Sequence, residues 1–401
     1  MANTILTPTA VTREALRVLH QKLNFVGNIN RTYDDSFAKS GAKIGDSLKI
    51  RLPNEYVVRS GATLSTQDTT ETSATLQVAT QKGVDLNFTS VDLTLSLDDF
   101  SSRILQPAMS VLAANIEADA LTMYKDVYNL VDQDATAFTW NTVLNGRKTL
   151  NDSLAPMDNN RSCLLSTASS VKLVDALKGL FQDSGEIAKQ YREGKMGRTA
   201  GFDFYENTLL TSHLTGTSPK TTAQTVNGAV TTNGSTSLVL AGTTYTWKQG
   251  DVFTVAGCYR VHPESKVSTN VLQQFVVTAD CTGVAGQTLY FSPSINTSTG
   301  RQNVVAAGMA NGSSLVKVGA GASEYLNGDL VFHRDAFAFA TADLTMPTGV
   351  DFAAREVMDG ISMRVVRQYD ISNDKFPTRL DVLYGFKTIR PQLAARLHAD
   401  G

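Results

Sequence analysis

The stretch from Leu97 to Val131 constrains the fold most, because its apolar side chains repeat at helical spacing. Steps of three and four residues separate the members of this series, which places them on one side of an α-helix. The series is Leu105, Met109, Leu112, Ile116, Ala120, Met123, Val127 and Leu130. Polar residues such as Asn115, Asp119 and Lys125 fall on the other side. The pattern predicts a helix with one packed face, and taken alone it favours an ordinary core helix of an α+β enzyme.

The residues at the start of this stretch predict where the helix begins. Ser96 precedes Asp99 by three residues, the spacing of an N-cap and a capping-box acid. Inside a helix, Pro107 would remove a backbone donor and clash with the preceding turn. We therefore expect the helix to bend at Pro107 or to begin there, with the proline in its first turn. From Pro107 onward the rod would be about 35 Å long at ~1.5 Å per residue.

Composition excludes several classes of protein. A chain of 401 residues with 42% hydrophobic and 18% charged content is long enough for two or three folded domains. A net charge of -2 provides no basic stripe for sequence-specific nucleic-acid binding, although such a chain can enclose nucleic acid. The sequence has no secretory signal and no run of about 18 apolar residues, so we expect no membrane span.

The three cysteines, Cys163, Cys258 and Cys281, are odd in number and widely spaced. This predicts reduced thiols in a cytosolic compartment, although Cys258 and Cys281 could approach each other within one β-domain.

The N-terminal part predicts an arm, a short helix and a long hairpin. Residues 1–11 are expected to be extended, and Thr12 to cap an amphipathic helix. The hairpin tip, residues 60–72, has too few apolar side chains to pack on its own chain, so it would lie on a neighbour or be a mobile surface loop. The apolar side of the helix would carry Ala15, Leu16, Leu19 and Leu23, and the strands expected here are 47–52, 55–59, 74–80 and 84–88.

The rest of the chain alternates helix and strand, as an α+β domain does, and is interrupted by a β-rich block. From about Thr217 to Ser323 the sequence is rich in Thr, Ser, Gly, Asn and Val and has no helical period, which predicts a small barrel or sandwich inserted into another domain. Its strand candidates are 237–240, 251–255, 275–279, 288–292 and 314–318. Outside the block we expect helices at 141–151, 166–180 and 187–193, and strands at 162–165, 201–205, 328–332, 336–340, 361–367 and 379–385.

A search for catalytic or ligand-binding motifs gives no candidate. The five histidines are scattered without metal-ligand spacing, and no CxxC pair, phosphate-binding glycine loop or GxSxG elbow occurs. The glycine-rich stretch Gly319–Ala322 is not followed by a helical pattern, which favours a hinge leaving the inserted domain over a phosphate loop. We therefore predict no catalytic residue, no cofactor and no metal site.

Six phrases, in order along nearly the whole chain, carry a family resemblance. They are Gly41-Ala-Lys-Ile-Gly-Asp46, Gln81-Lys-Gly-Val-Asp85, Asp92-Leu-Thr-Leu-Ser-Leu-Asp-Asp-Phe100, Gly201-Phe-Asp-Phe-Tyr-Glu206, Lys248-Gln-Gly-Asp-Val-Phe-Thr-Val-Ala-Gly257, and Asp381-Val-Leu-Tyr-Gly385 with Arg390-Pro391. In these the chain resembles the major capsid proteins of short-tailed double-stranded DNA phages related to the Salmonella-phage coat protein. That resemblance implies the α+β Hong Kong 97-type capsid fold with an inserted all-β, barrel-like domain.

The resemblance also implies a division of the chain. Residues 1–40 would be the N-terminal arm, 41–82 the extended hairpin, and 83–137 a peripheral domain built on the long helix as its spine. Residues 138–216 would begin the axial domain, 217–323 would be the insert, and 324–401 would complete both domains. The type member of the fold joins its subunits covalently through a hairpin lysine, but no lysine occurs between Lys49 and Lys82 here, so a non-covalent shell is expected.

As a major capsid protein, the chain would self-assemble into hexamers and pentamers of an icosahedral virion shell, formed in the host bacterial cytoplasm. The shell would enclose double-stranded DNA without sequence-specific binding, and its partners would be a scaffolding protein, a portal protein and, in some shells, decoration proteins. Because coat sequence begins almost at Met1, that scaffolding protein is expected to be separate. The candidate subunit-interface residues are Arg51, Glu55, Arg59, Asp68 and Glu71. The alternatives are a β-rich tail or adhesin component binding host glycans, and a hydrolase with a β-insert.

Overall fold

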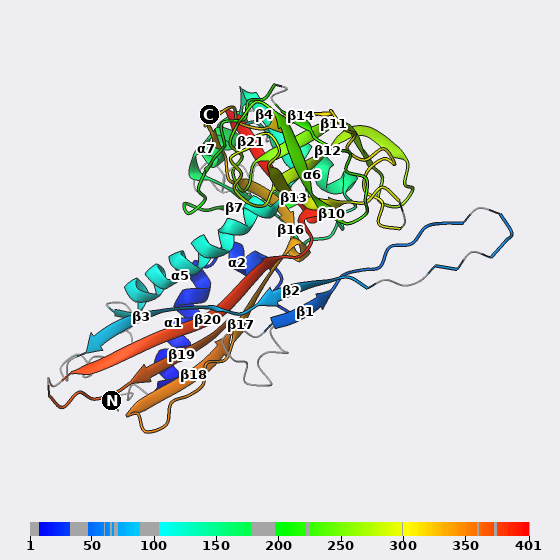
Figure 1. Cartoon of the computed structure of the whole chain (residues 1–401). Helices are drawn as coiled ribbons and strands as arrows, with labels where there is room; N and C mark the ends of the chain where they lie inside the picture. Colours follow the sequence, from blue (N-terminus) through cyan, green and yellow to red (C-terminus); the bar gives the residue numbers. More distant parts are fainter. Residues whose placement is uncertain are drawn as a thin grey trace. The chain divides into compact units, whose positions relative to one another are not determined.

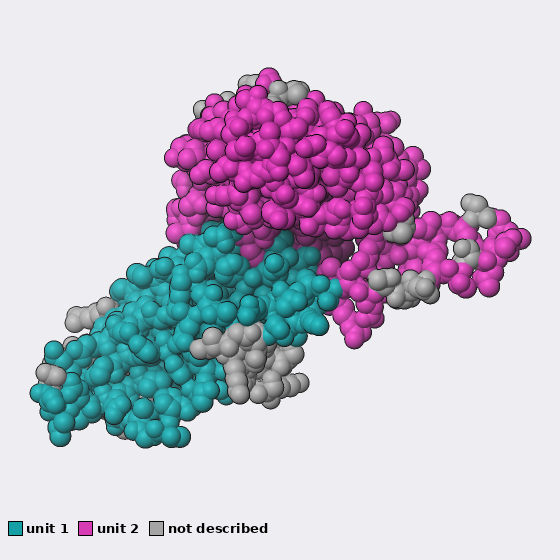
Figure 2. Space-filling view, in the orientation of Figure 1, with its two compact units in different colours: residues 1–50, 73–122, 337–389 teal, residues 51–72, 123–336, 390–401 magenta. Residues whose placement is uncertain are grey.

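The computed structural model divides into two compact units (Figure 2). It describes residues 8–32, 47–59, 61–64, 66–67, 71–88, 104–177, 197–221, 224–298, 300–358, 361–372 and 375–400. Unit 1 comprises residues 1–50, 73–122 and 337–389, and unit 2 comprises residues 51–72, 123–336 and 390–401. The expected cap at Ser96 and Asp99 and the helical piece at 187–193 lie outside the described residues.

Unit 1 is built on an antiparallel sheet with strand order β17-β20-β19-β18, in which β3 also pairs with β20 (Figure 1). Its strands are β3 (Thr80–Phe88), β17 (Phe337–Ala342), β18 (Phe352–Met358), β19 (Ile361–Arg367) and β20 (Phe376–Thr388). A separate two-stranded sheet pairs β1 (Ser47–Arg51) with β2 (Ser73–Gln77). Every residue of β17 is buried, so its alternating Phe and Ala pack on both faces.

Three helices pack on one another and on this sheet. They are α1 (Pro8–Lys22), α2 (Phe25–Asn28) and α5 (Gln106–Leu121). The helix α1 contacts β18, β19 and α5, and its predicted apolar residues are all buried. Thr12 lies inside α1, four residues after its start, so the prediction that it caps the helix is wrong. The proline and the small side chains before Thr12 allow the helix to begin at Pro8.

The long helix starts as predicted and ends earlier than predicted. It begins at Gln106 with Pro107 in its first turn, and its predicted apolar series is buried throughout. It ends at Leu121, continues as the short 3-10 helix η3 (Thr122–Asp126), and the chain then enters strand β4 (Leu130–Ala137). The rod therefore measures about 24 Å at ~1.5 Å per residue. The continuing helical period misled the prediction, because Val127 and Leu130 are buried outside the helix.

The polar side of α5 is not a free surface either. The Glu117 carboxylate is buried and accepts hydrogen bonds from the Phe25 and Val26 backbone N–H groups at the start of α2. Asp119 pairs with Lys82 Nζ at 2.7 Å and accepts a hydrogen bond from the Tyr384 hydroxyl at 2.5 Å. The helix is thus fastened to α2, β3 and β20 on more than one side.

Unit 2 contains a six-stranded mixed sheet in the order β4-β21-β16-β5-β7-β6. Beside β4 its strands are β5 (Arg161–Leu165), β6 (Arg198–Thr199), β7 (Phe202–Glu206), β16 (Asp329–His333) and β21 (Ala394–Asp400). Helix α6 (Trp140–Asp152) packs on β4, β16 and β21, and α7 (Thr167–Leu177) packs on β5. The helix α6 can approach closely because a Cβ at Gly146 would lie 2.9 Å from both Val331 and Leu397 side chains. Short 3-10 turns, η4 (Arg334–Ala336) and η5 (Pro391–Leu393), precede β17 and β21.

A closed barrel with strand order β10-β13-β12-β11-β14-β9 lies within unit 2. Its strands are β9 (Gln224–Val226), β10 (Ser235–Gly242), β11 (Val252–Val261), β12 (Ser268–Val277), β13 (Thr288–Ile295) and β14 (Ser314–Val318). The barrel core packs Trp247 and Phe291 against Phe253, with ring centroids 5.6 and 6.1 Å apart. The short strands β8 (His213–Leu214) and β15 (Tyr325–Leu326) pair where the chain enters and leaves the barrel. An inserted barrel is therefore confirmed.

A buried polar centre fastens the barrel at this neck. Asp251, fully buried, accepts hydrogen bonds from the Gly216 N–H at 3.0 Å and the Lys248 N–H at 2.8 Å, and pairs with His213 Nε2 at 2.9 Å. Lys317, also buried, donates to Thr215 Oγ1 at 3.1 Å and to the Gly216 carbonyl at 3.0 Å. Burial lowers the pKa of Lys317, an effect that the nearby Asp251 carboxylate opposes. These contacts join the entering and leaving segments to the barrel wall.

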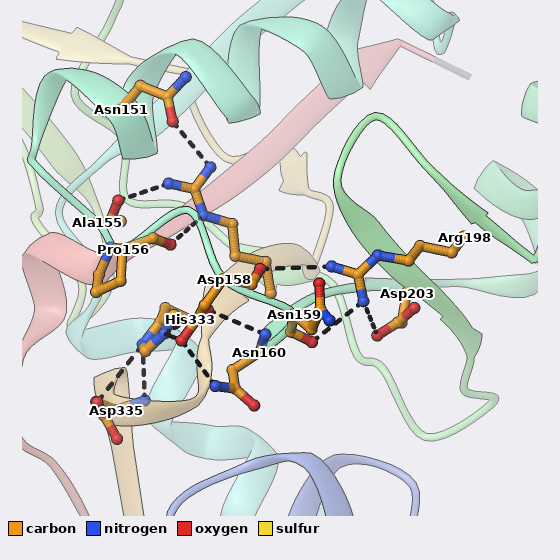
Figure 3. A network of polar contacts seen from close by, with 11 residues as sticks. Asn151, Ala155, Pro156, Asp158, Asn159, Asn160, Arg198, Asp203, His333 and Asp335 are labelled. Carbon is orange, nitrogen blue, oxygen red and sulfur yellow. Dashed lines mark hydrogen bonds and ion pairs between the residues drawn. The ribbon is translucent and has the colours of Figure 1, made fainter.

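A second polar network fixes the connection between α6 and β5 (Figure 3). Asp158 pairs with His333 Nε2 at 3.1 Å and accepts hydrogen bonds from the Asn160 N–H and side chain. The Asp335 N–H donates to His333 Nδ1 at 3.2 Å. Arg198 donates to the Asn159 carbonyl at 3.2 Å and to Asp203 at 3.1 Å. Residues from five segments of unit 2 thus converge on one turn.

All five strands predicted inside the barrel are present, as are helices α6 and α7 and strands β5, β7, β16, β17, β19 and β20. The predicted strand at 55–59 is wrong, because residues 52–59 belong to no helix or strand. Strands β4, β9, β18 and β21 were not predicted. The three cysteines are free and buried.

Candidate assembly interface

In the segment between β1 and β2, none of the residues that the structure describes is buried. At the base of this segment, the Leu52 N–H donates a hydrogen bond of 2.8 Å to the Thr72 carbonyl. Further out, the Gln67 side chain accepts from the Val57 N–H at 2.9 Å and donates to the Val57 carbonyl at 2.5 Å. Figure 1 shows this segment as a long loop that continues beyond the ends of β1 and β2. A side-chain amide therefore replaces a strand ladder in holding the two arms together.

The structure places four of the five predicted interface residues. Arg51 Nη1 lies 3.5 Å from Glu71 Oε2 across the two arms, and Glu55 Oε2 lies 3.7 Å from Lys266 Nζ of the barrel. Arg59 donates to the carbonyls of Gly61 and Thr63 in the same loop. Asp68 lies outside the described residues. Within one subunit these charges thus have local partners, and exposed pairs of this kind stabilise a fold by about 0–1 kcal/mol each.

Four large apolar side chains, which were not among the predicted interface residues, are exposed on this loop. Val58 is 89% exposed and Leu64 is 79% exposed, and Tyr56 and Val57 are 56% and 40% exposed. Single exposed apolar residues are common on protein surfaces. Four within nine positions of one loop expose enough apolar surface to water to raise the free energy of the isolated subunit. The run Tyr56-Val57-Val58 indicates this feature in the sequence, because no comparable run of apolar residues occurs on the other side of the loop, in residues 61–72.

A second exposed apolar feature lies in unit 1, at the turn between β19 and β20. Ile371 is 84% exposed, while the Tyr369 and Phe376 rings lie 4.9 Å apart and the Arg367 guanidinium lies 5.3 Å from the Phe376 centroid. The ring pair and the cation–π contact stiffen a turn that presents Ile371 outward.

The described residues offer no obvious ligand chemistry. In these parts of the chain no group of three or more His, Cys, Asp and Glu side chains is placed to hold a metal ion. None of the described helices is long and apolar enough to cross a membrane. The surface features above are therefore the candidates for function.

Comparison with known proteins identifies the family. The sequence model described as "P22 coat protein - gene protein 5" matches residues 11–396. The chain belongs to the P22 coat protein family. This confirms the predicted relationship to phage coat proteins, and the mixed helix and sheet architecture with an inserted barrel is consistent with the Hong Kong 97-type fold. A coat protein is a structural component of the virion capsid and forms shells with copies of itself, which implies a non-enzymatic role.

A comparison with solved structures finds matches of low sequence identity. The protein of Mycobacterium phage Che8 is 13% identical, with 93% of this chain and 90% of that chain covered and a TM-score of 0.45. The capsid of cyanophage P-SCSP1u is 13% identical, with 91% and 86% covered and a TM-score of 0.42. The CUS-3 coat protein I-domain is 24% identical and covers 25% of this chain and 98% of its own, with a TM-score of 0.20. No curated protein matches.

Proposed function

We propose that this coat protein assembles into hexamers and pentamers of an icosahedral shell around double-stranded DNA, with the loop between β1 and β2 reaching onto the neighbouring subunit. The exposed apolar side chains of Tyr56, Val57, Val58 and Leu64 carry this proposal. Burial of apolar surface contributes about 25 cal/mol per Å², so a neighbour that covers these side chains gains binding energy that the subunit alone cannot realise. Because each subunit has several neighbours, contacts that are weak one by one suffice for a closed shell.

The parts of the chain take corresponding roles in this proposal. Residues 1–40 form the arm, 41–82 the extended hairpin, and 83–137 a peripheral domain with α5 as spine. Residues 138–216 and 324–401 complete the axial and peripheral domains, and 217–323 form the insert. Arg51, Glu55, Arg59, Asp68 and Glu71 would tune the contacts around the apolar loop, since rim charges affect partner choice more than affinity.

Assembly in this proposal takes place in the host cytoplasm, guided by a separate scaffolding protein and nucleated at a portal protein. Decoration proteins can add to the finished shell. The net charge of -2 supports an inner wall that does not grip the packaged DNA.

Deletion of residues 60–72 tests the role of the loop. We expect the variant to remain a folded, soluble monomer, because the deletion stops before β2 and none of the described residues that it removes is buried. Co-expressed with its scaffolding protein, it should give no closed shells in electron micrographs, whereas the wild-type chain does.

Two matched point variants sharpen this test. Val58→Asp places a charge on the most exposed apolar residue of the loop, and Val284→Asp does the same at a position between β12 and β13 of the barrel that is 49% exposed. The first should reduce shell yield at least tenfold and the second should not. Normal shells from both the deletion and Val58→Asp would refute the loop's role, and a wild-type chain that stays monomeric under all conditions would refute shell assembly itself.

A further inference from the structure

The barrel of unit 2 touches the loop of its own chain at one defined place. Glu55 lies beside Lys266 of the turn between β11 and β12, and beside Gly300 of the segment that follows β13. We infer that Lys266, Gly300 and Gln302 form a seat in which the barrel holds the loop at Glu55, so that the insert sets the direction in which the loop leaves its own subunit. This goes beyond the proposed function, which says only what the loop reaches.

Gly300 is the strongest evidence for a seat. A Cβ at this position would overlap the Glu55 carbonyl oxygen and would lie 2.8 Å from the Glu55 carbonyl carbon and 3.1 Å from the Tyr56 nitrogen. These are backbone atoms, which cannot move aside as the end of a flexible side chain can. The missing side chain of Gly300 therefore allows the backbone of the loop to approach the barrel closely at this position.

Lys266 is held in position before it meets Glu55. Its side chain is 12% exposed, and its Nζ donates to the Gln302 carbonyl at 3.3 Å. Its backbone, at a φ of 56°, is fixed by a hydrogen bond from its N–H to the His262 carbonyl at 3.0 Å, and the His262 N–H donates to the Val267 carbonyl at 2.8 Å. A preorganised ammonium loses little conformational entropy when a carboxylate arrives.

Charge around the seat agrees with this arrangement. Burial raises the pKa of Tyr128 to about 12, with the Arg260 guanidinium opposing the shift and the Glu55 carboxylate adding to it. Arg260 in turn lies 3.5 Å from Asp152 of α6. Glu55 and Arg260 thus both lie within electrostatic range of Tyr128, and Lys266 is the cation that pairs with Glu55, at 3.7 Å.

Spin-label distances in the unassembled full-length chain test the seat. Labels on Val58→Cys and Val284→Cys occupy exposed positions on the loop and the barrel, and the native cysteines are buried. We expect a narrow distance distribution, because the seat fixes residues 55–56. Adding Gly300→Ala should at least double its width. Gly27→Ala is the matched control, since a Cβ at Gly27 meets nothing within 4 Å.

A charge exchange provides a second measurement that does not depend on Gly300. Glu55→Lys and Lys266→Glu should each broaden the distribution, and the double variant should narrow it again because it restores an opposite-charge pair. The seat would be overturned if the distance distribution of the Gly300→Ala variant were as narrow as that of the labelled chain with Gly300. It would also be overturned if the distribution of the double variant were as broad as those of the two single variants. The measurement uses subunits outside any shell, so its failure would leave the loop's role in assembly to be judged by the deletion of residues 60–72.

Discussion

Asp251 shows how a single residue can be essential without taking part in any reaction. It belongs to the phrase Lys248-Gln249-Gly250-Asp251, and each member of the phrase has a structural task. Gly250, at a φ of 100°, accepts a hydrogen bond from the buried Arg396 guanidinium through its carbonyl, 2.8 Å long. A Cβ there would lie 3.2 Å from the Lys125 side chain. The phrase therefore joins the barrel to β21 through a buried hydrogen bond and packs closely against η3.

Asp251→Asn should destabilise unit 2 by about 2–4 kcal/mol. The asparagine amide has a single oxygen, whereas the Asp251 carboxylate uses both of its oxygens to bind His213 and two backbone N–H groups. Urea unfolding followed through the fluorescence of the buried Trp247 measures the loss. Asp280→Asn is the control, since exposed Asp280 accepts one hydrogen bond from the Gln249 N–H at 2.8 Å. It should change stability by less than about 1 kcal/mol. Equal effects of the two substitutions would contradict a special role for the neck.

At the scale of elements, the sequence predicted those whose pattern is local. The α6 helix and five of the six barrel strands repeat at their own periods between turn residues, and they were predicted, whereas the three-residue strand β9 was not. The end of α5 was not, because Val127 and Leu130 continue the helical spacing and are buried beyond the helix, Leu130 against barrel residues and β21. Strand β21 was missed for a similar reason: its buried Arg396 and His398 are polar, and only the tertiary structure supplies their partners.

The turn between α6 and β5 gives a pH prediction. Burial raises the pKa of Asp158, but hydrogen bonds from Asn160 and His333 outweigh it and leave that pKa below its ordinary value. A lowered folded-state pKa means that ionised Asp158 stabilises the fold above the unfolded pKa of about 3.9, and that this stabilisation is lost as the pH falls through the folded value. Asp158→Asn should cost about 1 kcal/mol near neutral pH, a small value because the side chain is partly exposed.

The measurement is the melting temperature between about pH 6 and pH 3. The difference between wild type and Asp158→Asn should shrink as the pH falls, because acid removes the same charge that the substitution removes. Asp351→Asn is the control, because Asp351 is comparably exposed and lies 3.7 Å from Arg367 as an ordinary surface ion pair. A constant difference across the range would exclude Asp158 as the titrating group.

For the whole molecule, the sequence was informative about architecture and less so about surfaces. The order of helix-bearing sequence, β-rich block and returning strands predicted a small barrel or sandwich inserted into an α+β framework, and the structure shows a closed barrel. The interface residues were harder to predict. Charged residues attract notice in a sequence, whereas the exposure of Val58 and Leu64 depends on the loop having nothing of its own to pack against.

We expect the subunits to be held in the shell by non-covalent contacts. Residues 50–81 contain no lysine, so the loop carries no side-chain amine for a cross-link, and the three cysteines are buried inside the subunit. Purified particles boiled in detergent without reductant should therefore run as a single 43.2 kDa band. If contacts are non-covalent and largely apolar, denaturant should also dissociate the shell in one cooperative step, since the loss of one subunit removes contacts from all its neighbours. A ladder of multimers on the gel would show a covalent link at another residue and would contradict this view of the shell.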